Sequence, residues 1–292
     1  MESKKEIYDL IPQKYYPTTL LISPSEAIAT VEANCLKEGV RFPLIAKPDV
    51  GLRGTAVKKI NNKEELEAYH KRANFNYLIQ NLIPYSREIG LFYVHYPNQP
   101  KGKITGIVEK EFLIVTGNGK NTIEELLAQN PRFAFQIPVL KKELKEQINH
   151  ILKEGEQMNL VPYGNHCRGS KFVDASQYIT PQLTETFNTI CQEIDGFYFG
   201  RMDIMFESYE ALAAGKNFEI VEINGALSEP THIYDPKHSL LYGWKELTRH
   251  FHYMYEISKI SHEEYNHPYL SFKEGIKEFK KHHQYYDVIL KF

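Results

Sequence analysis

Two short segments in the second half of the sequence place oxygen donors and a guanidinium at strand-like spacing. In residues 200–206 the alternation of a strand would put Arg201 and Asp203 on one face. In residues 218–225 the same alternation would put Glu222 and Asn224 together. If the two strands are neighbours, three oxygen ligands converge beside one guanidinium, a set that suits Mg²⁺. The alternative interpretation is a pair of half-buried strands with polar outer faces.

A second pattern is typical of anion binding. Lys47 ends an apolar segment, and a lysine there can direct a point charge at phosphates. Gly51 and Gly54 follow it, and glycines let backbone N–H groups approach an anion closely. The segment lacks the GK[ST] ending of a Walker A loop and the GxGxxG of a Rossmann turn. Taken alone, it favours an ordinary hairpin with glycine turns.

A third pattern is an apolar strand over residues 77–83, followed by Glu88. The main chain of such a strand can offer donors and acceptors to an adenine edge. Glu88 could then bond a ribose hydroxyl or orient Lys47. By itself this pattern indicates only a buried strand with an exposed carboxylate.

Taken in their order along the chain, the three patterns resemble the ATP-grasp superfamily, most of all its D-alanine–D-alanine ligase branch. The lysine and glycine segment comes first, then the apolar strand with Glu88, and last the two oxygen-rich segments. Residues 115–126 also look like cyanophycin-synthetase-type members of that superfamily. The resemblance covers residues 17–236. It implies an α+β chain with the ATP-grasp fold, in which two α+β lobes grip ATP at the cleft between them. The N-terminal domain that precedes these lobes in the ligases is expected to be absent or truncated, so the chain could be a truncated protein.

The resemblance also implies a role for individual residues. Lys47 and Arg201 take the catalytic positions, with Lys47 on the ATP phosphates and Arg201 near the transferred phosphoryl group. The magnesium ligands are Asp203, Glu222 and Asn224. The nucleotide-binding positions are Lys47, Gly51, Arg53, Gly54, Thr55, Gln80, Asn81, Leu82, Ile83 and Glu88. The sequence departs from the family where Gln80 and Asn81 replace the usual acidic residue of the adenine strand, and where Arg53 replaces a serine.

Two further segments supply candidates for binding the substrate. One is a turn-rich loop that contains Asn165, Arg168 and Gly169, and such a set can clamp a carboxylate or phosphate. The other follows Asn224 directly and contains Glu229 and His232. A histidine satisfied by its surroundings is the alternative interpretation for His232.

The activity that the resemblance implies is an ATP-dependent carboxylate–amine ligase working through an acylphosphate. Its cofactors would be ATP and one or two Mg²⁺ ions, with Mn²⁺ as a substitute. Its partners would be a small carboxylic acid and an amine, and a homodimer is a further expectation because such families often form one. Two alternatives stay open: a nucleotide-binding sensor or scaffold without catalysis, and an ATP-grasp kinase that phosphorylates a small molecule.

The composition limits the other classes of function. The chain has 292 residues, enough for about two domains, and 35 Lys and Arg against 37 Asp and Glu give a net charge of −2. This balance provides no basic field for nucleic acid. No apolar run is long enough to span a bilayer. The three cysteines, Cys35, Cys167 and Cys191, are far apart and favour a reducing, cytoplasmic location.

Along the chain we expect an N-terminal part with the small lobe over residues 1–84, and the large lobe with the metal site over 85–240. A C-terminal helical extension would occupy residues 241–292. Helices are expected over 62–73 and 139–153, and another after a cap at Asn121. The expected strands span residues 18–22, 42–47, 55–60, 77–83, 88–96, 111–116, 198–206 and 218–224.

Overall fold

The computed structural model describes residues 3–51, 54–161, 164 and 169–292. A small lobe contains a four-stranded antiparallel sheet in the order β1-β4-β2-β3. Its elements are β1 (Thr19–Ile22), α2 (Ile28–Lys37), β2 (Leu44–Pro48), β3 (Lys58–Ile60), α3 (Lys63–Arg72) and β4 (Tyr77–Asn81). Helix α3 begins where the Asn62 side chain accepts a hydrogen bond from the backbone of Glu65. Leu66 and Tyr69 of α3 are buried in the core of this lobe.

The large lobe is a five-stranded antiparallel sheet in the order β11-β10-β5-β6-β9. Its strands are β5 (Arg87–Val94), β6 (Lys103–Glu111), β9 (Lys171–Asp174), β10 (Phe199–Phe206) and β11 (Phe218–Asn224). The helices associated with it are α1 (Lys4–Leu10), α7 (Pro181–Gln192) and α8 (Tyr209–Ala213). Helix α7 buries Phe187 against the apolar residues on one face of this sheet. The opposite face of β5 and β10 carries the charged residues Glu88, Arg201 and Asp203 and, further along β5, the apolar Phe92 and Val94.

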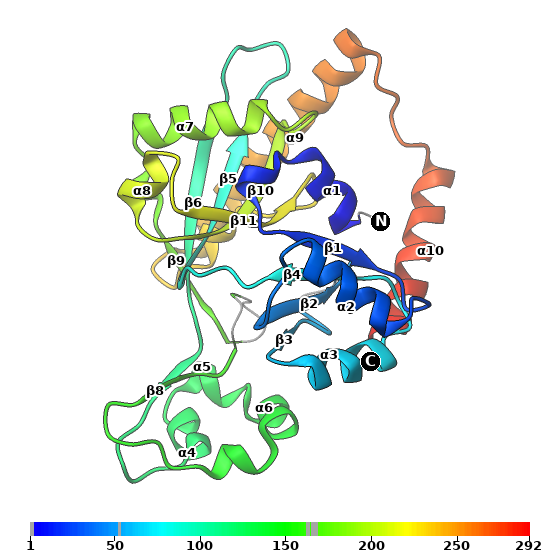
Figure 1. Cartoon of the computed structure of the whole chain (residues 1–292). Helices are drawn as coiled ribbons and strands as arrows, with labels where there is room; N and C mark the ends of the chain where they lie inside the picture. The colour runs from blue at the N-terminus through cyan, green and yellow to red at the C-terminus, as the bar shows by residue number, and fades with distance from the viewer. Residues whose placement is uncertain (1–2, 52–53, 162–163, 165–168) are drawn as a thin grey trace.

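Residues between β6 and β9 form a separate subdomain, which extends from the rest of the molecule in Figure 1. It has a core of its own that includes Leu113, Leu127 and Leu140. Its elements are β7 (Ile114–Thr116), α4 (Ile123–Ala128), α5 (Pro131–Ala134), α6 (Ile137–Leu144) and β8 (Gln157–Asn159). The 3-10 helices of the described chain are Gln13–Tyr15, Lys145–Asn149, Ser176–Tyr178 and Thr231–Tyr234.

The C-terminal part consists of α9 (Leu240–Tyr265) and α10 (Phe272–Ile289). Ile257 of α9 packs on Phe92 and Val94 of the large lobe. The end of α10 instead returns to the small lobe, where Ile289 is 1% exposed and Phe292 packs near Tyr69 with a ring-centroid distance of 4.8 Å. The C-terminal part therefore contacts both lobes.

Most expected elements are confirmed, and the differences have local causes. The helix expected over residues 139–153 is wrong in extent, because Lys145 has a φ of +51°, a left-handed conformation that ends α6. The helix expected after Asn121 is capped by Thr122, which forms a capping box with Glu125. Strand β6 was not expected, and the strand expected over 111–116 divides between the end of β6 and β7.

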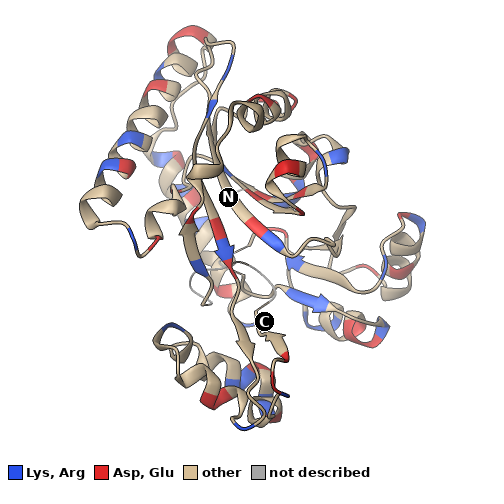
Figure 2. Cartoon of the chain, turned by 90° about the vertical axis from the view of Figure 1, so that its left-hand side faces the viewer, with Lys and Arg blue, Asp and Glu red and all other residues tan. Residues whose placement is uncertain are grey.

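The distribution of charged residues and the hydrophobicity of the helices agree with what the composition predicts. Acidic and basic residues are interspersed along helices and strands in Figure 2 and are not gathered by sign. Within the described part of the chain, no helix combines the length and apolar character needed to cross a membrane. Cys35 and Cys191 are buried free thiols, and Cys167 lies outside the described residues.

The docking of α10 on the small lobe gives a first prediction. Ile289→Ala should destabilise the protein by about 2–5 kcal/mol, because it opens a cavity in a packed core. The matched control is Ile276→Ala in the same helix, where the side chain is 41% exposed and the loss should stay within about 0.5 kcal/mol. Urea unfolding followed by circular dichroism measures both. Equal midpoints for the two variants would contradict the packing of α10 on the small lobe.

Candidate active site

A cavity of about 590 Å³ is lined by residues of both lobes and by α1. The predicted site residues that the small lobe contributes to it are Lys47, Gly51, Gly54, Gln80, Asn81, Leu82 and Ile83. Those from the large lobe are Glu88, Arg201, Asp203, Glu222, Asn224 and Glu229. The three sequence patterns, which lie far apart along the chain, therefore meet at one cavity.

The pairing of β10 with β11 brings the two oxygen-rich segments together. Asp203 lies opposite Glu222 in the register of these strands, and Arg201 lies opposite Asn224. On the other side of β10, Asp203 is opposite Gly90 of β5. A Cβ at Gly90 would lie 2.9 Å from Cδ of Arg201 and 3.2 Å from Oδ1 of Asp203. Glycine at this position therefore leaves room for the ion pair between Arg201 and Asp203 on the neighbouring strand.

Asp203 is the centre of a buried cluster of charges. Arg201 Nε donates to Asp203 Oδ1 over 2.9 Å, and Lys110 Nζ of β6 lies 3.1 Å from Asp203 Oδ2. Lys110 also donates to Glu88 Oε1 over 2.6 Å. Burial alone would raise the pKa of Asp203, but Arg201 and Lys110 lower it to about 2. The Asp203 carboxyl is therefore ionised at neutral pH.

Glu88 and Lys110 hold each other in place within this cluster. Glu88 is 5% exposed, Lys110 is 6% exposed, and Glu88 Oε2 also accepts a hydrogen bond of 3.0 Å from the backbone N–H of Gly164. Burial lowers the pKa of Lys110, but Asp203 and Glu88 outweigh it and the pKa is raised. Lys110 therefore carries a fixed positive charge on the cavity wall.

Lys47 lies in β2 on the opposite side of the cavity and is 6% exposed. Its ammonium donates to Tyr8 Oη and Gln80 Oε1, both over 2.9 Å, and to the carbonyl of Val221 over 3.3 Å. Burial, together with the nearby charge of Lys4, lowers the pKa of Lys47 to about 7. An anion placed beside Lys47 would favour its charged form.

The carboxylates and amide at β10 and β11 fit a hard divalent cation. Asp203 and Glu222 supply ionised oxygens: burial raises the pKa of Glu222, but Lys4 and Lys47 together outweigh it and the pKa is lowered. Asn224 can offer a cation only its amide oxygen, and its Nδ2, a hydrogen-bond donor, is buried without a partner within the described residues. Among those residues, no three His, Cys, Asp or Glu side chains are grouped closely enough to hold a metal ion. The candidate set is therefore two carboxylates with one amide, which leaves room for phosphate oxygens.

The remaining predicted residues lie elsewhere. Thr55 and Gly169 do not line the cavity. His232 does not line the cavity either: it is 2% exposed, and its Nε2 lies 3.6 Å from Glu246 Oε2 of α9. Three predicted residues lie outside the described part of the chain: Arg53, Asn165 and Arg168.

Two cations of the cavity, Lys110 and Lys4, were not predicted from the sequence. Lys110 stands between Glu109 and Glu111, a pattern typical of a solvated surface. The alternation of a strand was the available signal, because it puts Lys110 and Val108 on one face and the two glutamates on the other. Lys4 precedes every motif of the resemblance, and no spacing relates it to them.

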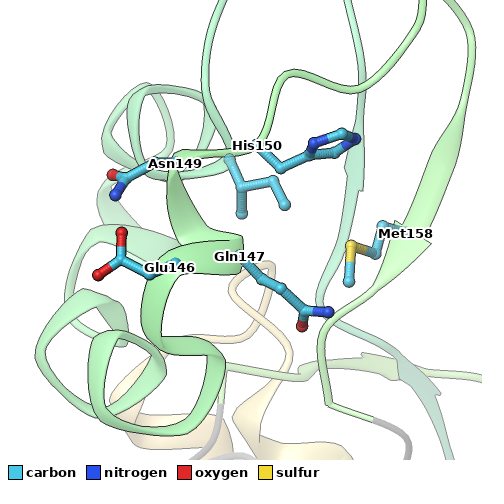
Figure 3. A pocket seen from close by; sticks show the side chains of 6 residues that line it. Glu146, Gln147, Asn149, His150 and Met158 are labelled. Atoms are coloured by element: carbon cyan, nitrogen blue, oxygen red, sulfur yellow. The ribbon is translucent and has the colours of Figure 1, made fainter.

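A second cavity, of about 560 Å³, lies in the subdomain between β6 and β9. Figure 3 shows the side chains that line it, with Gln147 and Met158 on facing sides of the opening. It contains one carboxylate, Glu146, and one imidazole, His150. This set lacks the paired carboxylates and cations of the first cavity.

Comparison with solved structures identifies the fold. The D-alanine–D-alanine ligase of Bacillus anthracis is similar with a TM-score of 0.50 and 13% sequence identity, over 90% of this chain and 68% of that chain. The protein thus has an ATP-grasp fold, as the sequence resemblance implied. No family model matches the sequence.

Two further relatives are longer proteins. The Clostridium perfringens glutathione biosynthesis bifunctional protein GshAB is 26% identical over 138 residues, which are 42% of this chain and 18% of that protein. A bifunctional glutathione synthetase from Pasteurella multocida aligns with 14% identity and a TM-score of 0.40, over 89% of this chain and 35% of its own. This chain therefore spans about a fifth to a third of the length of these relatives.

The charge cluster gives a second prediction. Lys110→Met should destabilise the protein by about 3–5 kcal/mol at pH 7, because it leaves the buried Glu88 and Asp203 without a shared cation. Lys171→Met is the matched control, since the ion pair of Lys171 with Glu111 is exposed and should contribute less than about 1 kcal/mol. Urea unfolding compares the two. If the Lys110→Met variant is as stable as the Lys171→Met control, Lys110 does not balance the buried charges of Glu88 and Asp203.

Proposed function

We propose that this protein is an ATP-dependent carboxylate–amine ligase that forms an amide through an acylphosphate. The observation that carries the proposal is the meeting of Arg201 and Asp203 with Glu222, Asn224 and Lys47 at one cavity of an ATP-grasp fold. This arrangement combines fixed cations for phosphates with oxygen donors for a divalent cation. The names of the similar proteins, which are ligases and glutathione synthetases, support the same reaction class.

The nucleotide is proposed to lie along the small lobe with its phosphates toward the large lobe. The main chain of residues 80–83 at the end of β4 would face the adenine edge. Lys47 and Lys110, from opposite walls of the cavity, would bind phosphate oxygens. Glu88 would act mainly by holding Lys110, since its two carboxylate oxygens are already engaged by Lys110 and the Gly164 N–H.

Asp203, Glu222 and Asn224 are proposed to hold magnesium. When bound, the ion would neutralise charge on the phosphate oxygens. Arg201 lies next to this set, where its guanidinium would bind the phosphoryl group during transfer and stabilise the charge that develops there. The ion pair with Asp203 keeps that guanidinium in a fixed orientation, so little reorganisation is needed.

The proposed reaction has two steps. A substrate carboxylate oxygen attacks the γ-phosphorus of ATP, and the bond to the bridging oxygen breaks to release ADP. The nitrogen of an amine then attacks the acyl carbon, loses a proton to solvent or base, and expels phosphate. Glu229, which lines the cavity and accepts a 2.6 Å hydrogen bond from Tyr234 Oη, is proposed to bind the amine as its ammonium form. That ammonium first loses a proton to solvent, which gives the nitrogen the lone pair it needs for the attack.

The test is ADP release with Mg·ATP and pooled carboxylic acids, with and without hydroxylamine. The wild type should form a hydroxamate that depends on the acid. Asp203→Asn and Glu222→Gln should lose at least about 100-fold in turnover, because each removes a charge from the transition-state site. Glu210→Gln, an exposed carboxylate on α8, is the matched control and should stay active.

Other outcomes of this test would indicate a different class of protein or a different metal site. ADP release with a phosphorylated product but no hydroxamate would replace the ligase with a kinase. Nucleotide binding without ADP release on any acid would replace it with a sensor or scaffold. Full turnover in Asp203→Asn or Glu222→Gln would contradict the assignment of the metal ligands.

The lowered pKa of Lys47 gives a prediction on pH. At pH 8.5, above its pKa of about 7, Lys47 is mostly neutral in the free protein, and phosphates beside it would favour the ammonium. Binding of Mg·ATP should therefore take up about one proton at this pH. Titration calorimetry in buffers of different ionisation enthalpy measures the uptake. Lys47→Arg, which stays charged, should remove it, and equal uptake by both proteins would contradict the role of Lys47.

A further inference from the structure

The N-terminal helix α1 is fixed against the loop that follows Lys47. The backbone N–H of Lys4 donates to the carbonyl of Asp49 over 3.0 Å. Ser3 Oγ and the backbone N–H of Lys5 both donate to the Asp49 carboxylate over 2.9 Å. In Figure 1, α1 lies between the large-lobe strand β11 and the small-lobe strand β1. Three hydrogen bonds therefore hold the start of α1 beside the cavity, independently of the Lys4 side chain.

The Lys4 side chain enters the cavity and reaches the proposed metal site. Its ammonium donates to Glu222 Oε1, and its side chain is only 17% exposed. A Cβ at Gly51 would lie 2.9 Å from Cε and 3.1 Å from Nζ of Lys4. The ammonium thus lies between a candidate metal ligand and the glycine loop proposed to face the phosphates.

The Glu222 oxygen that accepts from the Lys4 ammonium cannot keep this ion pair unchanged while it binds a divalent cation. Burial lowers the pKa of Lys4, but Glu222, with smaller contributions from Tyr8 and Asp49, outweighs it, and the pKa is raised. A charged ammonium donates hydrogen bonds and has no lone pair for a metal. It would also repel a cation bound a few ångströms away. Binding of a cation at Glu222 therefore requires Lys4 to move or to weaken its ion pair.

We propose that Lys4 is an exchangeable counter-ion of Glu222: it neutralises this carboxylate until a divalent cation binds there, and is then released to the nucleotide phosphates. The proposal rests on the nucleotide and metal positions of the proposed function and adds a positioning residue from α1. The proposed phosphate position would be within its reach, because the Lys4 ammonium lies 3.1 Å from the point where a Cβ at Gly51 would stand. The anchoring of α1 by Asp49 keeps the released ammonium near them.

Lys5, the next residue of α1, is a lysine that does not reach the cavity. Lys5 pairs with Asp9 one turn further along α1, and both side chains lie at the surface. Lys4 instead pairs with a residue 218 positions away, on a strand of the large lobe. The two lysines have the same side chain and adjacent positions, so Lys5 is a matched control.

The experiment measures binding of Mn²⁺ and of a non-hydrolysable ATP analogue to the full chain. Free Mn²⁺ is followed by electron paramagnetic resonance without nucleotide, and the analogue by calorimetry at saturating Mg²⁺. Lys4→Met should bind Mn²⁺ at least about fivefold more tightly, because a competing cation is gone, and the analogue at least about fivefold more weakly. Lys4→Arg should behave like the wild type in both, and Lys5→Met should change neither.

Opposite shifts in the two affinities distinguish this role from a structural one. If Lys4→Met weakens both ligands, or leaves Mn²⁺ binding unchanged, the counter-ion proposal is overturned. Lys4→Gln repeats the comparison if the methionine variant does not fold, which circular dichroism checks. Neither measurement needs turnover. If the two affinities shift in opposite directions but no hydroxamate forms, the counter-ion role of Lys4 is supported and the ligase proposal fails. If hydroxamate forms but the affinities do not shift in this way, the ligase proposal is supported and the counter-ion role fails.

Discussion

The buried carboxylate of Asp203 is the constraint on which the site depends. It is 5% exposed and lies between the cations of Arg201 and Lys110, and burying it without them would cost several kcal/mol. Arg201 comes from the same strand, whereas Lys110 comes from β6, two strands away in the sheet. Strands β5, β6 and β10 must therefore pair in this register for the charge to be balanced.

A second set of polar contacts joins the lobes at the other wall. The ammonium of Lys47 in β2 is bound by Tyr8 of α1, Gln80 of β4 and the carbonyl of Val221 in β11. Each acceptor comes from a different element, so movement of either lobe changes the surroundings of this lysine. Lys47, which is proposed to bind a phosphate, thus also forms hydrogen bonds that join the two lobes.

The part of the site that follows local rules could be predicted from the sequence. Strand alternation identified Arg201 with Asp203 and Glu222 with Asn224, and the ATP-grasp resemblance gave the fold. Lys110 was missed because its flanking glutamates look like a solvated strand, and the alternation that separates it from them does not say which face points inward. The contact of α1 with β11 joins residues more than 200 positions apart, and no local pattern encodes it. Burial of the histidine at 232 likewise depends on α9, which lies further along the chain.

The return of α10 means that the small lobe is not one continuous stretch of chain. Its core combines strands from residues 19–81 with Ile289, and Phe292 packs its ring near Phe75 and under the guanidinium of Arg72. A recombinant fragment that ended in the connection between β4 and β5 would lack one wall of that core and expose apolar surface. The core of this segmented lobe therefore depends on the end of α10 as much as on the strands that begin it.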